Sequence, residues 1–195
     1  MRILLITGMT SLEAPGGLTT HIRHIWNTVR SDHQVDVLHL GSQPRLFEMI
    51  RDEVIRRWDR LDPFLYYEVV QTYLELAYLQ LDQTYDVVHA HDVIAWNSLA
   101  DVVPSSVPFL LTVHSPYRIT EEMPDLDPSL VEYVEQCQYN AIRHADVLLT
   151  VSSWMKAELE SQSRRSVLLM ENAVDTARFV QAAKDGQRVR EQLGV

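Results

Sequence analysis

The sequence has little of several features that mark common classes of protein. Its single cysteine, Cys137, excludes a disulfide within the chain and suits a reducing, cytoplasmic location. The 17 Lys and Arg are outnumbered by 27 Asp and Glu, and the resulting net charge of -10 argues against a nucleic-acid partner. No apolar run is long enough to cross a bilayer, and the N-terminal run is too short for a signal-peptide core.

Two nucleotide-binding fingerprints are also absent, although the start of the chain has a related arrangement. The apolar run 3–6 predicts a buried strand, and apolar residues at helical spacing predict a helix over 18–29. Between them stands Pro15-Gly16-Gly17, which fits neither G-x-G-x-x-G nor G-x-x-x-x-G-K-[ST]. Because glycine lacks a Cβ, a phosphate can approach this backbone and the free N–H groups of the next helix. The alternative is an ordinary strand-to-helix turn.

The remainder of the chain alternates between short apolar runs and helical periodicity. Asp62-Pro63 interrupts one long helical region, because proline disfavours helix at the residue before it. Further strands are predicted over 33–40, 87–90, 108–113, 146–151 and 167–170, and helices over 44–61, 64–81, from 93, over 129–144, over 153–159 and from 176. This alternation predicts an α/β fold with a doubly wound, parallel, Rossmann-like sheet.

Polar residues and glycines follow the predicted strands. In a parallel sheet these positions meet at the carboxyl edge, where ligands bind. His114 is the strongest candidate for a functional side chain, because it leaves a central apolar strand at that edge. The residues expected at the edge are Gly16, Gly17, His91, Asp92, His114, Ser152 and Asn172 to Asp175.

Two segments have competing interpretations. The helical pair over 44–81 has two interpretations. It is a helical excursion packed on the sheet, or it forms a lid or wall on the acceptor side of a binding site. Its arginines are interleaved with acids, so a membrane-surface role is the weaker interpretation. The acidic residues between 121 and 135 are interpreted as a solvated loop and helix face rather than a metal site.

Most of the eight histidines are expected to be structural or at the surface. His89 and His91 alternate around Ala90, so within a strand their side chains point the same way. A metal pair is possible there, but no third ligand stands at a suitable spacing. His21, at the edge of the apolar stripe of its helix, is ambiguous. The pattern places His24 on the polar side of a helix and His144 near a helix end. It places His33 and His39 at strand ends.

A series of motifs, in order, resembles a known family. After the glycine pair come Asp-Val-Val-His-Ala-His-Asp (86–92), Leu-Thr-Val-His-Ser (111–115), Ala-Asp-Val-Leu-Leu-Thr-Val-Ser (145–152) and Glu-Asn-Ala-Val-Asp-x-x-x-Phe (171–179). The series resembles the N-terminal domain of retaining glycosyltransferases of the GT-B fold, family 4, the glycogen-synthase-like group. The resemblance covers nearly all of the chain.

The resemblance implies an acceptor-side domain over 1–180 and the start of an interdomain connection over 181–195. A C-terminal domain, absent from this chain, would hold most of a nucleotide-sugar donor. The acceptor would be a sugar or a lipid, peripheral membrane contact is possible, and neither a metal nor another cofactor is implied. The implied roles are donor diphosphate binding by Gly16 and Gly17, catalysis beside the transferred sugar by His114, the acceptor side for His91 and Asp92, and the cleft edge for Ser152, Asn172 and Asp175.

Two departures from the family pattern affect this interpretation. Asn172-Ala173 stands where the family usually has Asn-Gly, and the chain ends shortly after the helix-like stretch 188–194. We therefore expect a fragment that is inactive alone. The alternatives are a non-catalytic binding module or regulatory subunit of the same fold, and a sugar-nucleotide epimerase.

Overall fold

The computed structural model describes residues 1–115, 127–174, 176, 180 and 186–194. Within these residues, parallel strands form one six-stranded sheet in the order β2-β1-β3-β4-β5-β6. This order confirms the predicted parallel sheet. The strands are β1 (Arg2–Ile6), β2 (Gln34–Leu38), β3 (Val87–Ala90), β4 (Phe109–Val113), β5 (Val147–Thr150) and β6 (Leu168–Leu169).

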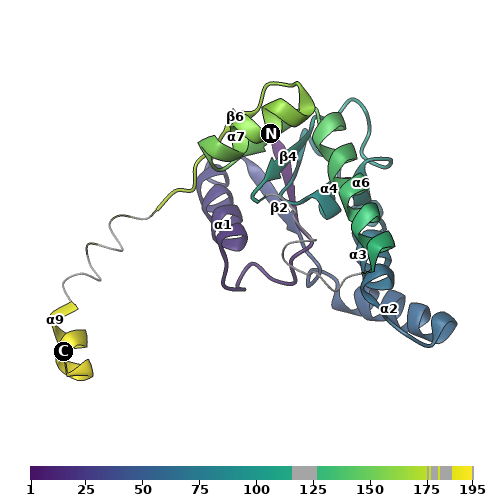
Figure 1. Cartoon of the computed structure of the whole chain (residues 1–195), viewed down its shortest axis with the longest axis horizontal. Coiled ribbons are helices and arrows are strands. Elements are labelled where there is room, and N and C mark those ends of the chain that lie inside the picture. The colour runs from purple at the N-terminus through teal and green to yellow at the C-terminus, as the bar shows by residue number, and fades with distance from the viewer. Residues whose placement is uncertain (116–126, 175, 177–179, 181–185, 195) are drawn as a thin grey trace.

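Helices cover both faces of the sheet, so the predicted double winding is confirmed. The chain runs from β1 to β2 in one direction and from β3 to β6 in the other, and right-handed crossovers then place α1 opposite the later helices. Figure 1 shows α1 on one side of the strands and α3, α4 and α6 on the other. The described helices are α1 (Gly17–Val29), α2 (Pro44–Trp58), α3 (Pro63–Leu79), α4 (Val93–Leu99), α6 (Pro128–His144), α7 (Ser153–Ser163) and α9 (Gly186–Leu193).

The core lies between the sheet and the helices of the α3–α4–α6 layer. The strands contribute apolar side chains that are almost fully buried, including Leu4, Ile6, Val88, Leu111 and Leu148. Burial on both faces explains why these strands read as continuous apolar runs without polar alternation. The same order makes β1 and β3 neighbours at the point where the winding reverses. Ligands of doubly wound folds bind outside the carboxyl ends of the strands at such a point.

A buried tyrosine anchors α3 to the connection between β2 and α2. Tyr73 is fully buried, and its hydroxyl donates to the His39 carbonyl oxygen (3.0 Å) and accepts from the Gln43 backbone N–H (2.9 Å). Burial raises the pKa of this hydroxyl. The anchor keeps the carboxyl end of β2 in a fixed relation to the helical pair α2–α3.

Most predicted boundaries agree with the structure to within a few residues. The interruption at Asp62-Pro63 is confirmed, because Asp62 accepts from the Leu65 backbone N–H (2.9 Å) and caps α3. The last strand is shorter than predicted. β6 pairs over Leu168 and Leu169 alone, and these side chains are 53% and 39% exposed at the edge of the sheet. The helix predicted to end at residue 159 continues to residue 163.

Two further predictions concern polar or C-terminal segments. Glu132 and Glu135 are exposed on α6, which confirms the solvated helix face, whereas residues 121, 122 and 125 lie outside the described residues. The predicted C-terminal helix is described over 186–193, and residues 177–179 and 181–185 lie outside the described part. None of the helices in the described part is both long and apolar enough to cross a membrane.

Candidate active site

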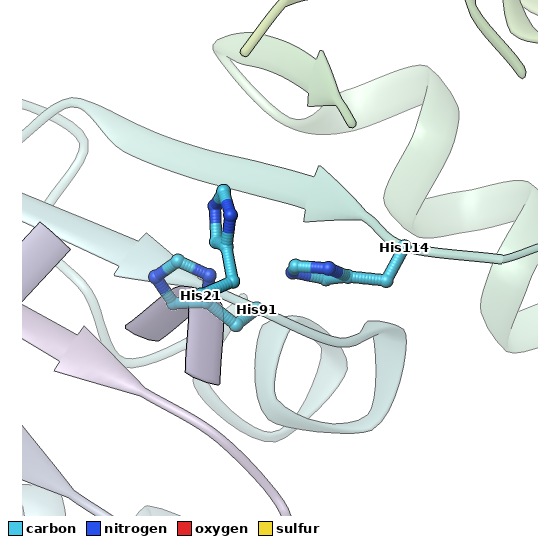
Figure 2. A group of neighbouring side chains, drawn as sticks. All are labelled: His21, His91 and His114. Atoms are coloured by element: carbon cyan, nitrogen blue, oxygen red, sulfur yellow. The ribbon is translucent and has the colours of Figure 1, made fainter. Parts of the chain in front are cut away.

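The carboxyl edge of the sheet brings together residues that are far apart in sequence. His91 follows β3 and His114 follows β4, as predicted, and α1 contributes His21 to the same place. Figure 2 shows the three rings close to one another. The His21 ring centroid lies 4.8 Å from that of His114 and 5.7 Å from that of His91. The edge predicted from the strand ends therefore carries a histidine cluster, defined here as His21, His91 and His114.

His89 supports the cluster from within the sheet. Its ring lies 4.2 Å from the ring of His91, centroid to centroid, so the two side chains share one face as the strand alternation predicted. Its Nε2 lies 2.7 Å from the Thr112 hydroxyl on β4. His89 therefore makes its contacts within the sheet, with Thr112 on β4 and with the ring of His91.

One hydrogen bond connects the cluster to the end of the last strand. His21 Nδ1 lies 2.8 Å from the Asn172 side-chain oxygen. Because an amide oxygen only accepts, His21 donates through Nδ1 and presents an unprotonated Nε2. That Nε2 is buried and has no hydrogen-bond partner among the described residues.

Burial controls the ionisation of these rings. It lowers the pKa of His91 well below the usual value and the pKa of His114 to about 4. Burial also lowers the pKa of His89 to about 3, and the pKa of His21 is lowered although its bond to Asn172 opposes the shift. At neutral pH the cluster is therefore uncharged and offers nitrogen lone pairs and N–H donors.

Asp92 organises the backbone beside the cluster. One carboxylate oxygen accepts from the Thr7 hydroxyl (2.9 Å) and the Gly8 backbone N–H (2.8 Å), and the other accepts from the Ala95 N–H (2.7 Å). Asp92 is thus the N-cap of α4, the helix that the sequence predicts from residue 93. Burial raises the pKa of Asp92, against the effect of these donors. The same carboxylate joins the end of β1 to the start of α4.

The glycine pair stands at the N-terminus of α1, as predicted. Gly17 is the first helical residue, and Gly16 at the N-cap position has no side chain that could cap the helix. A Cβ built on Gly17 would meet no described atom within 4 Å, so the surface here is open. The Thr19 hydroxyl donates to the Ala14 carbonyl oxygen (2.7 Å) and holds the preceding loop against the helix. The free N–H groups of this first turn can donate hydrogen bonds to an anion, one turn before His21.

Comparison with known proteins identifies the family of this arrangement. The profile described as Glycosyltransferase Family 4 matches residues 15–178, from the glycine pair to beyond the last strand. The chain belongs to glycosyltransferase family 4. The histidine cluster and both glycines fall within the matched range.

The other comparisons add little beyond this family. Among solved structures, the chain is similar to an "alpha-glucosyltransferase in complex with UDP-glucose and DNA containing an abasic site", with 12% identity and a TM-score of 0.46. The match covers 90% of this family 4 chain and 43% of that chain. This chain therefore spans less than half the length of the structure that it matches. The search of curated proteins found no match.

The other predicted site residues of this family 4 chain lie along the same edge or outside the described part. The Ser152 hydroxyl accepts from the Met155 backbone N–H (3.3 Å) and caps α7. Asn172 is exposed and contacts His21, as described above. Asp175 lies outside the described residues.

Sequence reasoning missed His21. It is 4% exposed and belongs to the cluster, although its position at the margin of the apolar stripe gave no clear role. Its spacing of one helical turn from Gly17 is the signal that could have identified it, because the first turn of α1 already points to the ligand edge. His21 and His114 also provide the partners that sequence spacing did not provide for His91.

Proposed function

We propose that this family 4 domain takes part in the transfer of a sugar, with retention of configuration, from a nucleotide-sugar donor to an acceptor. The observation that carries the proposal is the position of His21. It lies in the second turn of the open helix α1 and in contact with His114. A diphosphate at the start of α1 would therefore place its attached sugar near His114.

The start of α1 supplies the interaction that such a donor needs. Negative charge grows on the nucleoside diphosphate as its bond to the sugar breaks, and oriented N–H groups stabilise that charge. Gly16 and Gly17 are exposed, and the surface beside Gly17 is open. We assign donor diphosphate binding to these two residues. Further cations would come from a second domain that follows the connection at 181–195.

His114 is the residue that we assign to the transferred sugar. Its Nε2 is buried and unpaired within the described part of the chain, so it is available to a hydroxyl group. Because its pKa is about 4, it would bind the sugar as a neutral ring and not as a cation. Its role is then to hold the sugar during the departure of the diphosphate.

The acceptor and the second domain would meet the rest of the edge. We assign His91 and Asp92 to the acceptor side, and Ser152, Asn172 and Asp175 to the margin of the cleft. Since Asp92 already binds three donors, its contribution would be to hold the backbone on which the acceptor rests.

The helical pair α2–α3 would form a wall for the acceptor. An open groove of about 1040 Å³ runs between these helices, and exposed Met49, Trp58 and Phe64 contribute to its lining. Arg56 and Arg57 also line it, but both pair with Glu53, at 2.6 and 2.7 Å. An apolar groove with neutralised arginines suits the hydrocarbon part of a lipid acceptor more than an anionic membrane surface.

The test uses the complete protein that contains this chain, with a panel of UDP-, GDP- and ADP-sugars. Nucleotide release would be followed with and without sugar and lipid acceptors, and the anomeric configuration of the product would be determined by NMR. Acceptor-dependent release with a retained anomer supports the proposal. Release without an acceptor, with an altered sugar, would indicate an epimerase. No release from any donor by a folded protein would favour a binding module and contradict the proposal.

A further inference from the structure

The loop over 7–16, called the glycine loop here, carries the glycine pair and is held at both of its ends. At its start, two of its donors make hydrogen bonds of 2.9 and 2.8 Å to the Asp92 carboxylate. At its end, the Ala14 carbonyl oxygen accepts from the Thr19 hydroxyl (2.7 Å). Because the glycine loop leads directly into α1, its position decides where the first free N–H groups of that helix can meet an anion.

The middle of the glycine loop is held by the connection that follows β2, the turn over 39–42. The Leu40 backbone N–H donates to the Met9 carbonyl oxygen (2.9 Å). Gly41 packs so closely on the loop that a Cβ at this position would stand 2.4 Å from the Thr10 carbonyl oxygen. A change in the shape of the turn would therefore displace the glycine loop or leave it unsupported.

His39 fixes the shape of this turn with its backbone and with its ring. Its backbone N–H donates to the Ser42 hydroxyl (2.9 Å), and its carbonyl oxygen accepts from the Ser42 N–H (2.9 Å) and from the buried Tyr73 hydroxyl (3.0 Å). Ring Nδ1 accepts from the Gly41 N–H (3.1 Å). The backbone bonds are open to any residue, so the bond to Gly41 is what the histidine side chain adds.

The ring makes this bond in its neutral form. Because Nδ1 accepts, the proton of the neutral ring is on Nε2. Burial lowers the pKa of His39, and the Thr10 carbonyl oxygen opposes the shift without reversing it. At neutral pH the ring is therefore uncharged, and Nδ1 is free to hold the Gly41 N–H.

We propose that His39 is a positioning residue, whose ring holds the 39–42 turn and thereby keeps the glycine loop in place for the diphosphate of the donor. The proposal rests on the proposed function for the identity of the anion. A loop that is already in place loses less conformational freedom when the anion binds, so affinity is higher. Contacts to the diphosphate exist both before and during transfer, so loss of the brace should raise the Michaelis constant more than it lowers turnover.

The experiment uses variants of His39 in the complete protein that contains this chain. His39→Ala removes the acceptor for the Gly41 N–H. His39→Asn supplies another, because the side-chain oxygen of asparagine commonly accepts from the backbone N–H two residues further along. The matched control is His144→Ala, at an exposed position at the end of α6. Should His39→Ala not fold, His39→Leu, which fills the space without an acceptor, takes its place.

Three quantities are compared among these proteins: hydrogen exchange of the amides over 8–16, binding of UDP, GDP and ADP by calorimetry, and donor kinetics. In His39→Ala we expect the loop amides to exchange about fivefold faster or more, since their support is weakened. The dissociation constant for the diphosphate and the Michaelis constant for the donor should rise about fivefold or more, while turnover falls less than about threefold. His39→Asn and His144→Ala should stay within about twofold of the parent protein.

The proposal is overturned if folded His39→Ala keeps the exchange rates or the diphosphate affinity of the parent, or if His39→Asn is impaired as much as His39→Ala. A parent protein that binds a diphosphate but transfers no sugar would contradict the proposed function alone, because loop exchange and diphosphate affinity still decide the role of His39. A parent protein that binds none of the three diphosphates would contradict both proposals.

Discussion

The variant Gly17→Ala tests whether the start of α1 binds a ligand or is only a structural turn. A Cβ at this position meets no described atom within 4 Å, and Gly17 is already helical. Alanine favours helix over glycine by up to about 1 kcal/mol, so we expect the free energy of unfolding to stay unchanged or to rise by that amount. A diphosphate against the same backbone would collide with the new methyl group. We expect the Michaelis constant for the donor to rise at least tenfold, which corresponds to about 1.4 kcal/mol of binding.

Gly41→Ala is the matched control, because it places the same methyl group where the protein leaves no room. Its Cβ would stand 2.4 Å from the Thr10 carbonyl oxygen, so the backbone must shift. We expect a loss of about 1–3 kcal/mol in stability. Urea unfolding followed by circular dichroism measures stability for both variants, and donor kinetics use the complete protein. The reasoning is refuted if Gly17→Ala destabilises the fold as Gly41→Ala does, or if it leaves donor binding unchanged.

Three further variants test the fold by urea unfolding. Tyr73→Phe removes a fully buried hydroxyl that makes two backbone hydrogen bonds, and should cost about 2–3 kcal/mol; Tyr66→Phe, on an exposed ring, should change stability by less than about 0.5 kcal/mol. Arg165→Ala removes donors to the carbonyl oxygens of residues 142, 143, 145 and 146, and should lower the urea midpoint through a loss of about 1–3 kcal/mol. Burial, with the nearby Asp36 carboxylate, raises the pKa of Tyr85. The contribution of Tyr85 to the free energy of unfolding is therefore full below about pH 10, and it falls by about 1.4 kcal/mol per pH unit above that, because the tyrosine ionises first in the unfolded chain. Between pH 10 and 11 the free energy of unfolding of Tyr85→Phe should therefore decline less than that of the parent protein. An equal decline in both would contradict the raised pKa of Tyr85.

Much of the fold could be predicted because local pattern and tertiary structure agree. The strand over 87–90 was predicted with the boundaries that the structure has, since its apolar run is bounded by turn and cap signals. The observed caps at Asp62, Asp92 and Ser152 have a local signal of the same kind, because an oxygen before an apolar periodic segment accepts the first free N–H groups. The length of β6 was overestimated, because its apolar residues indicate a strand whether or not a second neighbouring strand pairs with it.

The candidate site was predicted only in outline. The strand ends indicated which edge would hold it, and His91 and His114 lie there. His21 could not be assigned, because sequence periodicity places a residue on a helix but does not say what the helix faces. That information comes from the order of the strands, which puts β1 beside β3 and so brings α1 to the cluster. The link from His21 to Asn172 crosses 151 positions of sequence and leaves no local pattern.

The central claim is that the carboxyl edge of this sheet holds the sugar during transfer, and His114 is the most direct point at which to test it. The measurement compares turnover of the complete protein with that of His114→Ala and of His144→Ala, an exposed control, after urea unfolding has been recorded for each. The account predicts that His114→Ala lowers turnover at least 100-fold while it remains folded, and that His144→Ala has normal activity. Normal turnover in folded His114→Ala would contradict the account.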